Sequence, residues 1–109
     1  MDLENTQSQM RKGVLEYCIL CIIGKNECYA SDIIDQMKDA RLIVVEGTLY
    51  PLLTRLKNGG LLNYKWEESK SGPPRKYYSL TEEGRSFLTA LSGTWNELSA
   101  AVTTIISKN

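Results

Sequence analysis

The chain has 109 residues, of which 42% are hydrophobic and 24% are charged, the balance of one ordinary globular domain. Thirteen basic residues offset thirteen acidic ones, and histidine is absent, which removes the commonest general base and a common metal ligand. We therefore expect neither an enzyme nor a metal or other cofactor. Without a secretory signal or an apolar run long enough for a membrane span, we expect a cytoplasmic protein with no membrane partner.

The basic residues gather in the middle of the chain. Residues 1–40 hold four basic and seven acidic residues, residues 41–79 hold seven and three, and residues 80–109 hold two and three. Phosphates meet a local patch rather than the total charge, so this distribution is compatible with a nucleic-acid partner despite the zero net charge.

Three helices are predicted in the first sixty residues. Met10–Ile23 is apolar on almost every side, as in a buried helix, and Ala30–Lys38 forms a second, amphipathic helix. The apolar residues 42–45, three of them β-branched, predict a short strand or extended link. In the third helix, leucines at 49, 52, 53 and 56 make one stripe. Because proline fits the first turn of a helix, Pro51 places its start near Gly47 or Thr48, and two glycines at 59 and 60 end it.

A β-hairpin follows, because the period of the pattern changes from helical to two. Leu62, Tyr64 and Trp66 alternate with polar residues, residues 69–74 form a turn with basic residues around it, and residues 75–80 form the second strand.

The last helix begins after Thr81, a good N-cap, and carries a heptad seam. We expect this seam to join two copies of the chain as a homodimer; packing against its own domain is the alternative. The predicted interface comprises Leu88, Leu91, Trp95, Leu98, Val102 and Ile105.

These elements predict a mainly α-helical fold with a small β-hairpin: a winged helix-turn-helix over residues 1–80 and a C-terminal dimerisation helix over residues 81–109. In such modules the third helix enters the major groove of DNA and the wing contacts the adjacent backbone or minor groove. An ordinary solvated face is the alternative for the third helix taken alone. The candidate DNA contacts are Thr48, Tyr50, Pro51, Thr54, Arg55 and Lys57 of the helix, and Lys70, Gly72, Arg75 and Lys76 of the wing.

The stretches TLYPLLTRLKNGGLL and GPPRKYYSLTEEG resemble the two signatures of the PadR family of bacterial repressors, and the single helix after them resembles its short subfamily. The resemblance implies a dimeric transcription repressor that leaves its operator when a small aromatic or drug-like effector binds, or in response to another signal. Because a two-fold dimer presents two equal readers, the double-stranded operator should contain an inverted repeat. Glu46 departs from the family pattern, where a small polar residue is frequent, and its carboxylate would repel phosphate.

The resemblance also implies an effector site at Trp95, which lies eleven residues after Gly84, as does the tryptophan of similar drug-binding members. Tyr17 and Glu16 of the first helix are candidates to line the same cavity. A tryptophan that only fills the dimer core is the alternative.

Three cysteines at 18, 21 and 28 are too few for a zinc site without histidine, so we expect reduced core residues, with a thiol switch as the alternative. Two other functions stay open: a winged-helix module that binds protein instead of DNA, and a ligand or redox sensor without operator binding.

Overall fold

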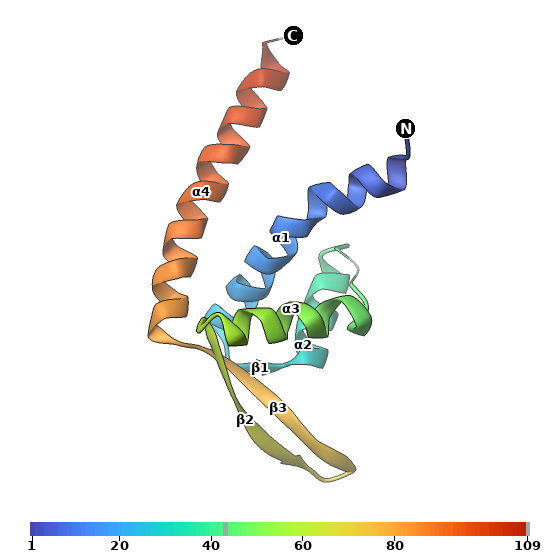
Figure 1. Cartoon of the computed structure of the whole chain (residues 1–109), viewed down its shortest axis with the longest axis vertical. Coiled ribbons are helices and arrows are strands. Elements are labelled where there is room, and N and C mark those ends of the chain that lie inside the picture. The colour runs from blue at the N-terminus through green and yellow to red at the C-terminus, as the bar shows by residue number, and fades with distance from the viewer. Residues whose placement is uncertain (43, 109) are drawn as a thin grey trace.

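A computed structural model of the chain describes residues 1–42 and 44–108 (Figure 1). It confirms the mainly helical class with a small antiparallel sheet. In chain order the elements are α1 (Leu3–Lys25), β1 (Cys28–Tyr29), α2 (Ala30–Asp39), α3 (Glu46–Asn58), β2 (Leu62–Ser69), β3 (Gly72–Leu80) and α4 (Glu82–Ser107). No helix in the described part of the chain combines the length and apolar character that crossing a membrane requires.

The sheet has three antiparallel strands in the order β1-β3-β2. Of the two structures predicted for residues 42–45, a short strand or an extended link, the described residues favour the link. Ile43 lies outside the described residues, residues 42, 44 and 45 belong to no strand, and Val45 has an extended backbone. Val44 is buried in the core, so its apolar character serves packing instead of strand pairing. The third strand is β1, between α1 and α2, where Cys28 pairs with Tyr78. The sequence predicted the short strand between the second and third helices, whereas the structure has it between the first and the second.

The hairpin turn is tighter than predicted. Ser69 already pairs with Gly72, so the two prolines at 73 and 74 lie within β3 and not in the turn. Proline has no N–H to donate to a neighbouring strand, so it is tolerated at a sheet edge. The prolines lie at such an edge, because β1 pairs with β3 only at Tyr77 and Tyr78 and, among the described residues, no other strand pairs with that side of β3.

Both ends of α3 show why the helix lies where it does. It begins at Glu46, slightly before the predicted start, which places Pro51 in the second turn. Because proline has no N–H, Pro51 gives the carbonyl of Gly47 no helical hydrogen bond. Both residues are exposed to water. At the other end Gly60 has φ +83°, the left-handed conformation expected for the stop. The N–H of Leu61 then donates to the carbonyl of Leu56 at 3.0 Å.

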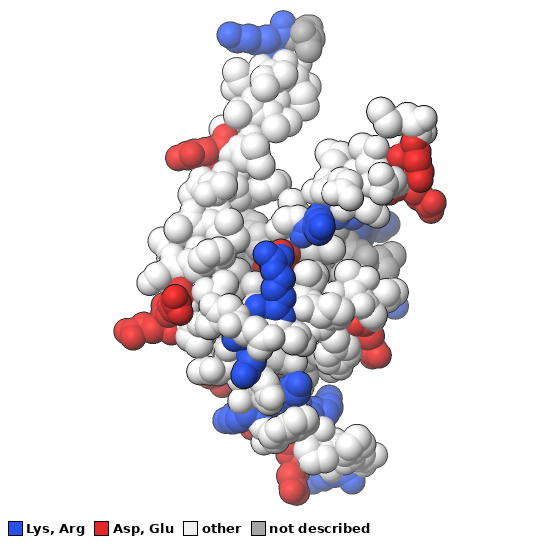
Figure 2. All heavy atoms as spheres, viewed as in Figure 1, with Lys and Arg blue, Asp and Glu red and all other residues white. Residues whose placement is uncertain are grey.

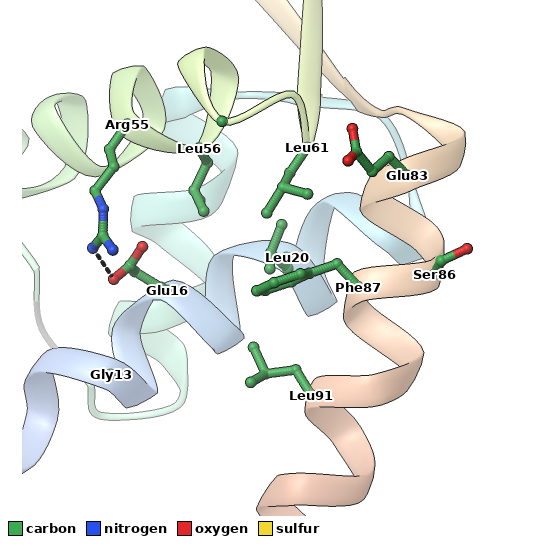
Figure 3. A pocket seen from close by; sticks show the side chains of 11 residues that line it. Gly13, Glu16, Leu20, Arg55, Leu56, Leu61, Glu83, Ser86, Phe87 and Leu91 are labelled. Carbon is green, nitrogen blue, oxygen red and sulfur yellow. Dashed lines mark hydrogen bonds and ion pairs between the residues drawn. The ribbon is translucent and has the colours of Figure 1, made fainter.

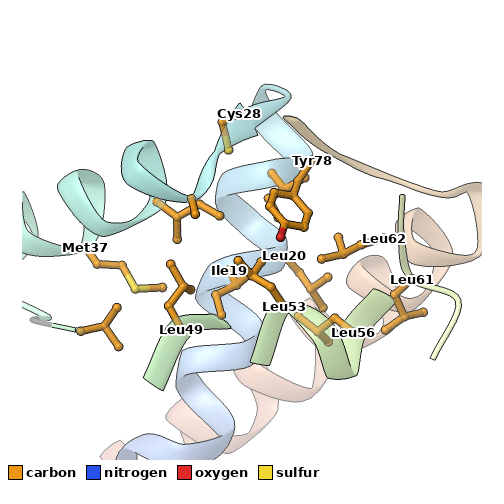
Figure 4. Packing of buried hydrophobic residues seen from close by; sticks show 14 residues of the cluster. Ile19, Leu20, Cys28, Met37, Leu49, Leu53, Leu56, Leu61, Leu62 and Tyr78 are labelled. Atoms are coloured by element: carbon orange, nitrogen blue, oxygen red, sulfur yellow. The ribbon is translucent and has the colours of Figure 1, made fainter. Parts of the chain in front are cut away.

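The core lies between the second half of α1, α2, α3 and the base of the sheet (Figure 4). The leucine stripe of α3 faces it as predicted, with Leu49 and Leu53 fully buried. The fully buried large side chains are Ile19, Leu20, Ile23, Ile33, Met37, Leu49, Leu53 and Leu62.

The α4 helix is anchored at its base. The hydroxyl of Thr81 accepts a hydrogen bond from the N–H of Gly84 at 2.9 Å, which confirms the predicted N-cap, and donates one to the carbonyl of Gly60 at 2.7 Å. A Cβ on Gly84 would lie 2.1 Å from the carbonyl oxygen of Leu61, so only glycine permits this approach. The end of α3 and the start of α4 are thereby held together.

From this base α1 and α4 project away from the hairpin, with both termini at the end opposite to it (Figure 1). The α1 helix begins at Leu3 and not at Met10, because the Asp2 carboxylate caps a polar first turn that carries no apolar stripe. The radius of gyration is 15.8 Å, whereas a compact domain of this length has about 13 Å. The projecting helices account for the excess.

Candidate nucleic-acid interface

The α3 helix and the hairpin meet in a corner that holds five of the ten predicted DNA contacts: Tyr50, Thr54, Lys57, Arg75 and Lys76. Cross-strand pairing puts Tyr64 opposite Tyr78 and Trp66 opposite Lys76, so these four side chains share the sheet face that looks onto α3. One hollow of the corner, about 150 Å³, is lined by Leu53, Thr54, Lys57, Asn58, Tyr64, Lys76 and Tyr78. A second, about 380 Å³, is lined by Tyr29, Ala30, Ser31, Glu46, Tyr50, Trp66, Pro74, Arg75, Lys76 and Tyr78.

Aromatic rings hold the cations of this corner in place. The Nζ of Lys76 lies 4.5 Å from the ring centroid of Tyr64 and 5.5 Å from that of Trp66. The Nζ of Lys57, on α3, lies 5.7 Å from the Tyr64 centroid. The guanidinium of Arg75 lies 3.9 Å from the Tyr29 ring. Such contacts orient the charged groups without neutralising them, so they remain available to an anion.

Charge is distributed unevenly over the surface. Basic side chains gather around α3 and along the hairpin, acidic and basic ones both lie near the hairpin tip, and most of α4 is uncharged (Figure 2). The remaining predicted contacts of α3, Thr48 and Pro51, are exposed, as are Lys70 and Gly72 at the hairpin turn. Glu46 lines the larger hollow of the corner, so its negative charge does lie beside the predicted DNA contacts.

Arg55 is set apart from the other predicted contacts. Its guanidinium pairs with the carboxylate of Glu16 on α1 at 2.6 Å (Figure 3). The Arg55 side chain is 70% exposed and that of Glu16 is 19% exposed. Arg55 thus lies on the side of α3 that faces α1, and it lines neither hollow of the corner. The sequence gives no local sign of this pair, since its members are 39 residues apart.

The structure brings together two of the three predicted effector residues. The rings of Tyr17 and Trp95 lie 6.3 Å apart between centroids and are inclined by 39°. The Tyr17 hydroxyl donates to Ser92 at 3.0 Å, a partner that the sequence did not suggest, although it lies one turn before Trp95. The hollow beside them, about 260 Å³, is lined by Met10, Gly13, Val14, Tyr17, Leu91, Thr94, Trp95 and Leu98.

Glu16 lines a different, larger groove of about 740 Å³ between α1, α3 and α4 (Figure 3). The ring of Phe87 points from α4 toward Leu20 across this groove and is half exposed. Phe87 lies outside the heptad seam, which is why the sequence pattern did not select it. The apolar lining comprises Leu20, Leu56, Leu61, Phe87 and Leu91.

The predicted seam of α4 divides in two. Leu88 and Leu91 are half-buried against the core of their own chain, the alternative considered for the whole helix. Trp95, Leu98, Val102 and Ile105 are exposed in the single chain. Between Leu88 and Ser107 the sequence has one charged residue, Glu97.

The cysteines occupy apolar surroundings. Burial raises the pKa of the Cys28 thiol to about 11, and the nearby Asp32 carboxylate adds to the shift. Burial also raises the pKa of Cys18, with a smaller effect of Cys21. A raised pKa lowers the thiolate fraction, and the thiolate is the reactive species, so these environments favour core residues over a thiol switch.

Comparison with known proteins places the chain in a family. The model of the transcriptional regulator PadR-like family matches residues 19–90. A PadR-like transcription factor from Bacteroides fragilis is 63% identical, with 93% of this chain and 98% of that one covered and a TM-score of 0.79. A PadR-like transcriptional regulator from Bacillus cereus is 38% identical, with coverages of 91% and 97% and a TM-score of 0.79. One from Eggerthella lenta is 29% identical, with coverages of 98% and 94% and a TM-score of 0.85.

Proposed function

Because the chain belongs to the PadR-like family of transcriptional regulators, we propose that it is a dimeric repressor that binds an inverted-repeat operator through α3 and the hairpin. The observation that carries this proposal is the corner between the two elements, where rings orient Lys57 and Lys76 beside the exposed face of α3. Phosphate contacts of this kind position a protein on the duplex, and side chains of the helix then read base edges.

We propose that two copies join through α4, so that residues 1–80 bind DNA and residues 81–109 dimerise. Apolar side chains on the outer half of α4, Leu98 and Val102 among them, are exposed in a stretch with a single charge, which is unfavourable for a helix surrounded by water. The groove beside Phe87 offers an apolar surface on the same side of the molecule. The outer half of α4 from a second copy fits the chemistry of this groove.

We further propose that a planar aromatic effector binds beside Trp95 and Tyr17. Two inclined rings and an apolar lining suit a flat guest. The hollow of about 260 Å³ falls just below the roughly 300–1,000 Å³ of drug-sized ligand sites. Two such hollows brought together by dimerisation would enclose the guest, and its binding would couple the dimer arrangement to release of the operator.

DNA binding is tested with duplexes selected from a random pool. Affinity should fall by about 10³ or more between about 50 and 200 mM salt, as for proteins that contact several phosphates. Lys57→Gln and Lys76→Gln should each reduce the salt slope by about one per subunit. Lys108→Gln removes the same charge at the far end of α4 and should leave the slope unchanged. Failure to select any duplex would instead favour a winged-helix module for protein binding.

Effector binding is tested by fluorescence. In Trp66→Phe the remaining tryptophan is Trp95, whose emission should be quenched saturably by some members of a panel of planar aromatic compounds. Trp95→Phe should abolish the response. If no compound quenches Trp95, and its replacement only lowers stability, the ring has a packing role alone.

A further inference from the structure

We infer that Trp66 contacts DNA: its indole packs on a deoxyribose of the duplex backbone while Lys76 binds the adjoining phosphate. This inference rests on the proposed function and adds to it a residue that was predicted only as part of a half-buried strand. Trp66 departs from that prediction, because its side chain is 63% exposed.

The exposure of Trp66 is exceptional on its face of the sheet. Leu62 and Tyr78 of the same face are buried, and Tyr64 is half-buried. Burial thus decreases along β2 toward the turn, and Trp66 projects beyond the core. Its ring is nevertheless held, since it meets Tyr64 edge-on at 5.8 Å between centroids and has the Lys76 ammonium beside it. A large ring fixed in water is ready for a ligand and loses little conformational entropy on binding.

The surroundings of Trp66 favour the DNA backbone as its ligand. The hollow that Trp66 lines also holds Arg75 and Lys76, together with Tyr50 from α3. Two cations favour an anionic ligand, and the indole beside them favours an apolar surface next to the anion. The sugar–phosphate backbone of DNA has both. Stacking on a base would first require that base to leave the helical stack, whereas the sugars of a duplex are already exposed.

Glu46, on the α3 side of the hollow, determines where the phosphate and the sugar of the DNA lie. Its carboxylate would repel a phosphate, so the phosphate belongs on the Lys76 side and the sugar over the indole. A second copy of this chain is a poorer occupant, because the hairpin lies opposite the projecting ends of α1 and α4, where the apolar side chains are exposed (Figure 1).

The chain has two tryptophans, so Trp95→Phe leaves Trp66 as the reporter. Adding a selected duplex to this variant should change Trp66 emission saturably and protect the ring from acrylamide. Trp66→Ala should weaken DNA binding about tenfold, the loss of one apolar ring contact, while Trp66→Phe retains most of the affinity. Because no charge is removed, Trp66→Ala should leave the salt slope unchanged, whereas Lys76→Gln lowers it.

Different outcomes separate the failure of this inference from that of the proposed function. If Trp95→Phe binds DNA with strong salt dependence, yet Trp66 emission, acrylamide access and the affinity of Trp66→Ala are all unchanged, Trp66 makes no contact and DNA binding stands. Emission that changes with protein concentration alone would show a protein contact and overturn the inference. If the unaltered protein binds no duplex from the pool, both proposals fall.

Discussion

The two halves of α1 belong to one helix but lie in opposite surroundings. Ile19 and Leu20 are completely buried between α2, α3 and the sheet, whereas Leu3 and Met10, two to five turns earlier, are 69% and 76% exposed. The α4 helix divides in the same way, with Leu91 half-buried near its base and Leu98 56% exposed further out. The molecule thus consists of a winged-helix body with its own core and two helical arms that expose apolar side chains.

This difference indicates what stabilises the body and what stabilises the arms. The body buries a continuous cluster of mainly aliphatic side chains within one chain, with α3 packed against α1 and the sheet, and this burial favours folding. The arms have helical hydrogen bonds but few tertiary contacts, and isolated helices of this length are marginal in water. A second copy of the chain is the partner that we propose for them. The predictions below test this division.

The largest effect is expected in the body. Leu53→Ala should lower the free energy of unfolding by about 2 to 5 kcal/mol, because it leaves a cavity at a completely buried position. Urea denaturation followed by circular dichroism measures the loss. The adjacent exposed residue supplies the control, since Thr54→Ala should change stability by about 0.5 kcal/mol or less. Equal losses for the two variants would mean that α3 does not present its leucine stripe to the core.

The arms should respond in assembly rather than in folding. Leu98→Lys should weaken self-association about a hundredfold, the equivalent of about 2.7 kcal/mol, because it replaces an apolar contact with an unpaired charge. Sedimentation equilibrium measures the association, and circular dichroism should show an intact fold. Ala100→Lys adds the same charge on the opposite face of α4 and should associate normally. A monomeric native chain, or equal behaviour of the two variants, would remove the arms from any dimer interface.

The features that the sequence predicted correctly depend on neighbours in the chain. The leucine stripe of α3, the left-handed Gly60 and the Thr81 cap all follow from contacts within one or two helical turns. The features that it missed depend on distant partners. The β1 strand has two residues and exists because Tyr77 and Tyr78 pair with it. Spacing patterns carry no information on such pairings.

The predicted site shows the same limit. Residues of α3 and the hairpin converge as expected because the strand and helix are joined by a short link whose geometry the glycines fix. Whether a given side chain of α3 faces the hairpin or α1 depends on the packing angle of the helices, and this decides that Arg55 meets Glu16. The exposure of Trp66 likewise depends on how far the hairpin extends beyond the core.

A smaller effect is expected at high pH. The Cys28 thiol has a pKa near 11 in the folded chain, against 9.0 as its ordinary value. Between these values the unfolded chain loses the proton and the folded chain keeps it, so stability falls as pH rises from 9 toward 11. Between pH 8 and pH 10 the native chain should lose about 1 kcal/mol more than Cys28→Ala. Urea denaturation at the two pH values measures this, and an equal loss in both proteins would show that Cys28 is not buried.

The smallest effect concerns the ion pair that joins α3 to α1 beside the groove. Arg55 is 70% exposed, so water and salt screen its attraction to Glu16 despite the 2.6 Å separation. A double-mutant cycle with Glu16→Gln and Arg55→Ala should give a coupling free energy of about 0.2 to 1 kcal/mol for unfolding, which vanishes in about 1 M salt.

The same pair lines the groove in which we propose that a second copy docks, so the cycle also tests where that copy lies. Docking would remove water from the pair and strengthen it, because charges interact more strongly where solvent is excluded. The coupling should therefore be larger in the native background than in the Leu98→Lys background, in which the proposed dimer is weakened. If the coupling is equally small and equally sensitive to salt in both backgrounds, the outer half of α4 does not cover this groove, and the arms must associate through another surface.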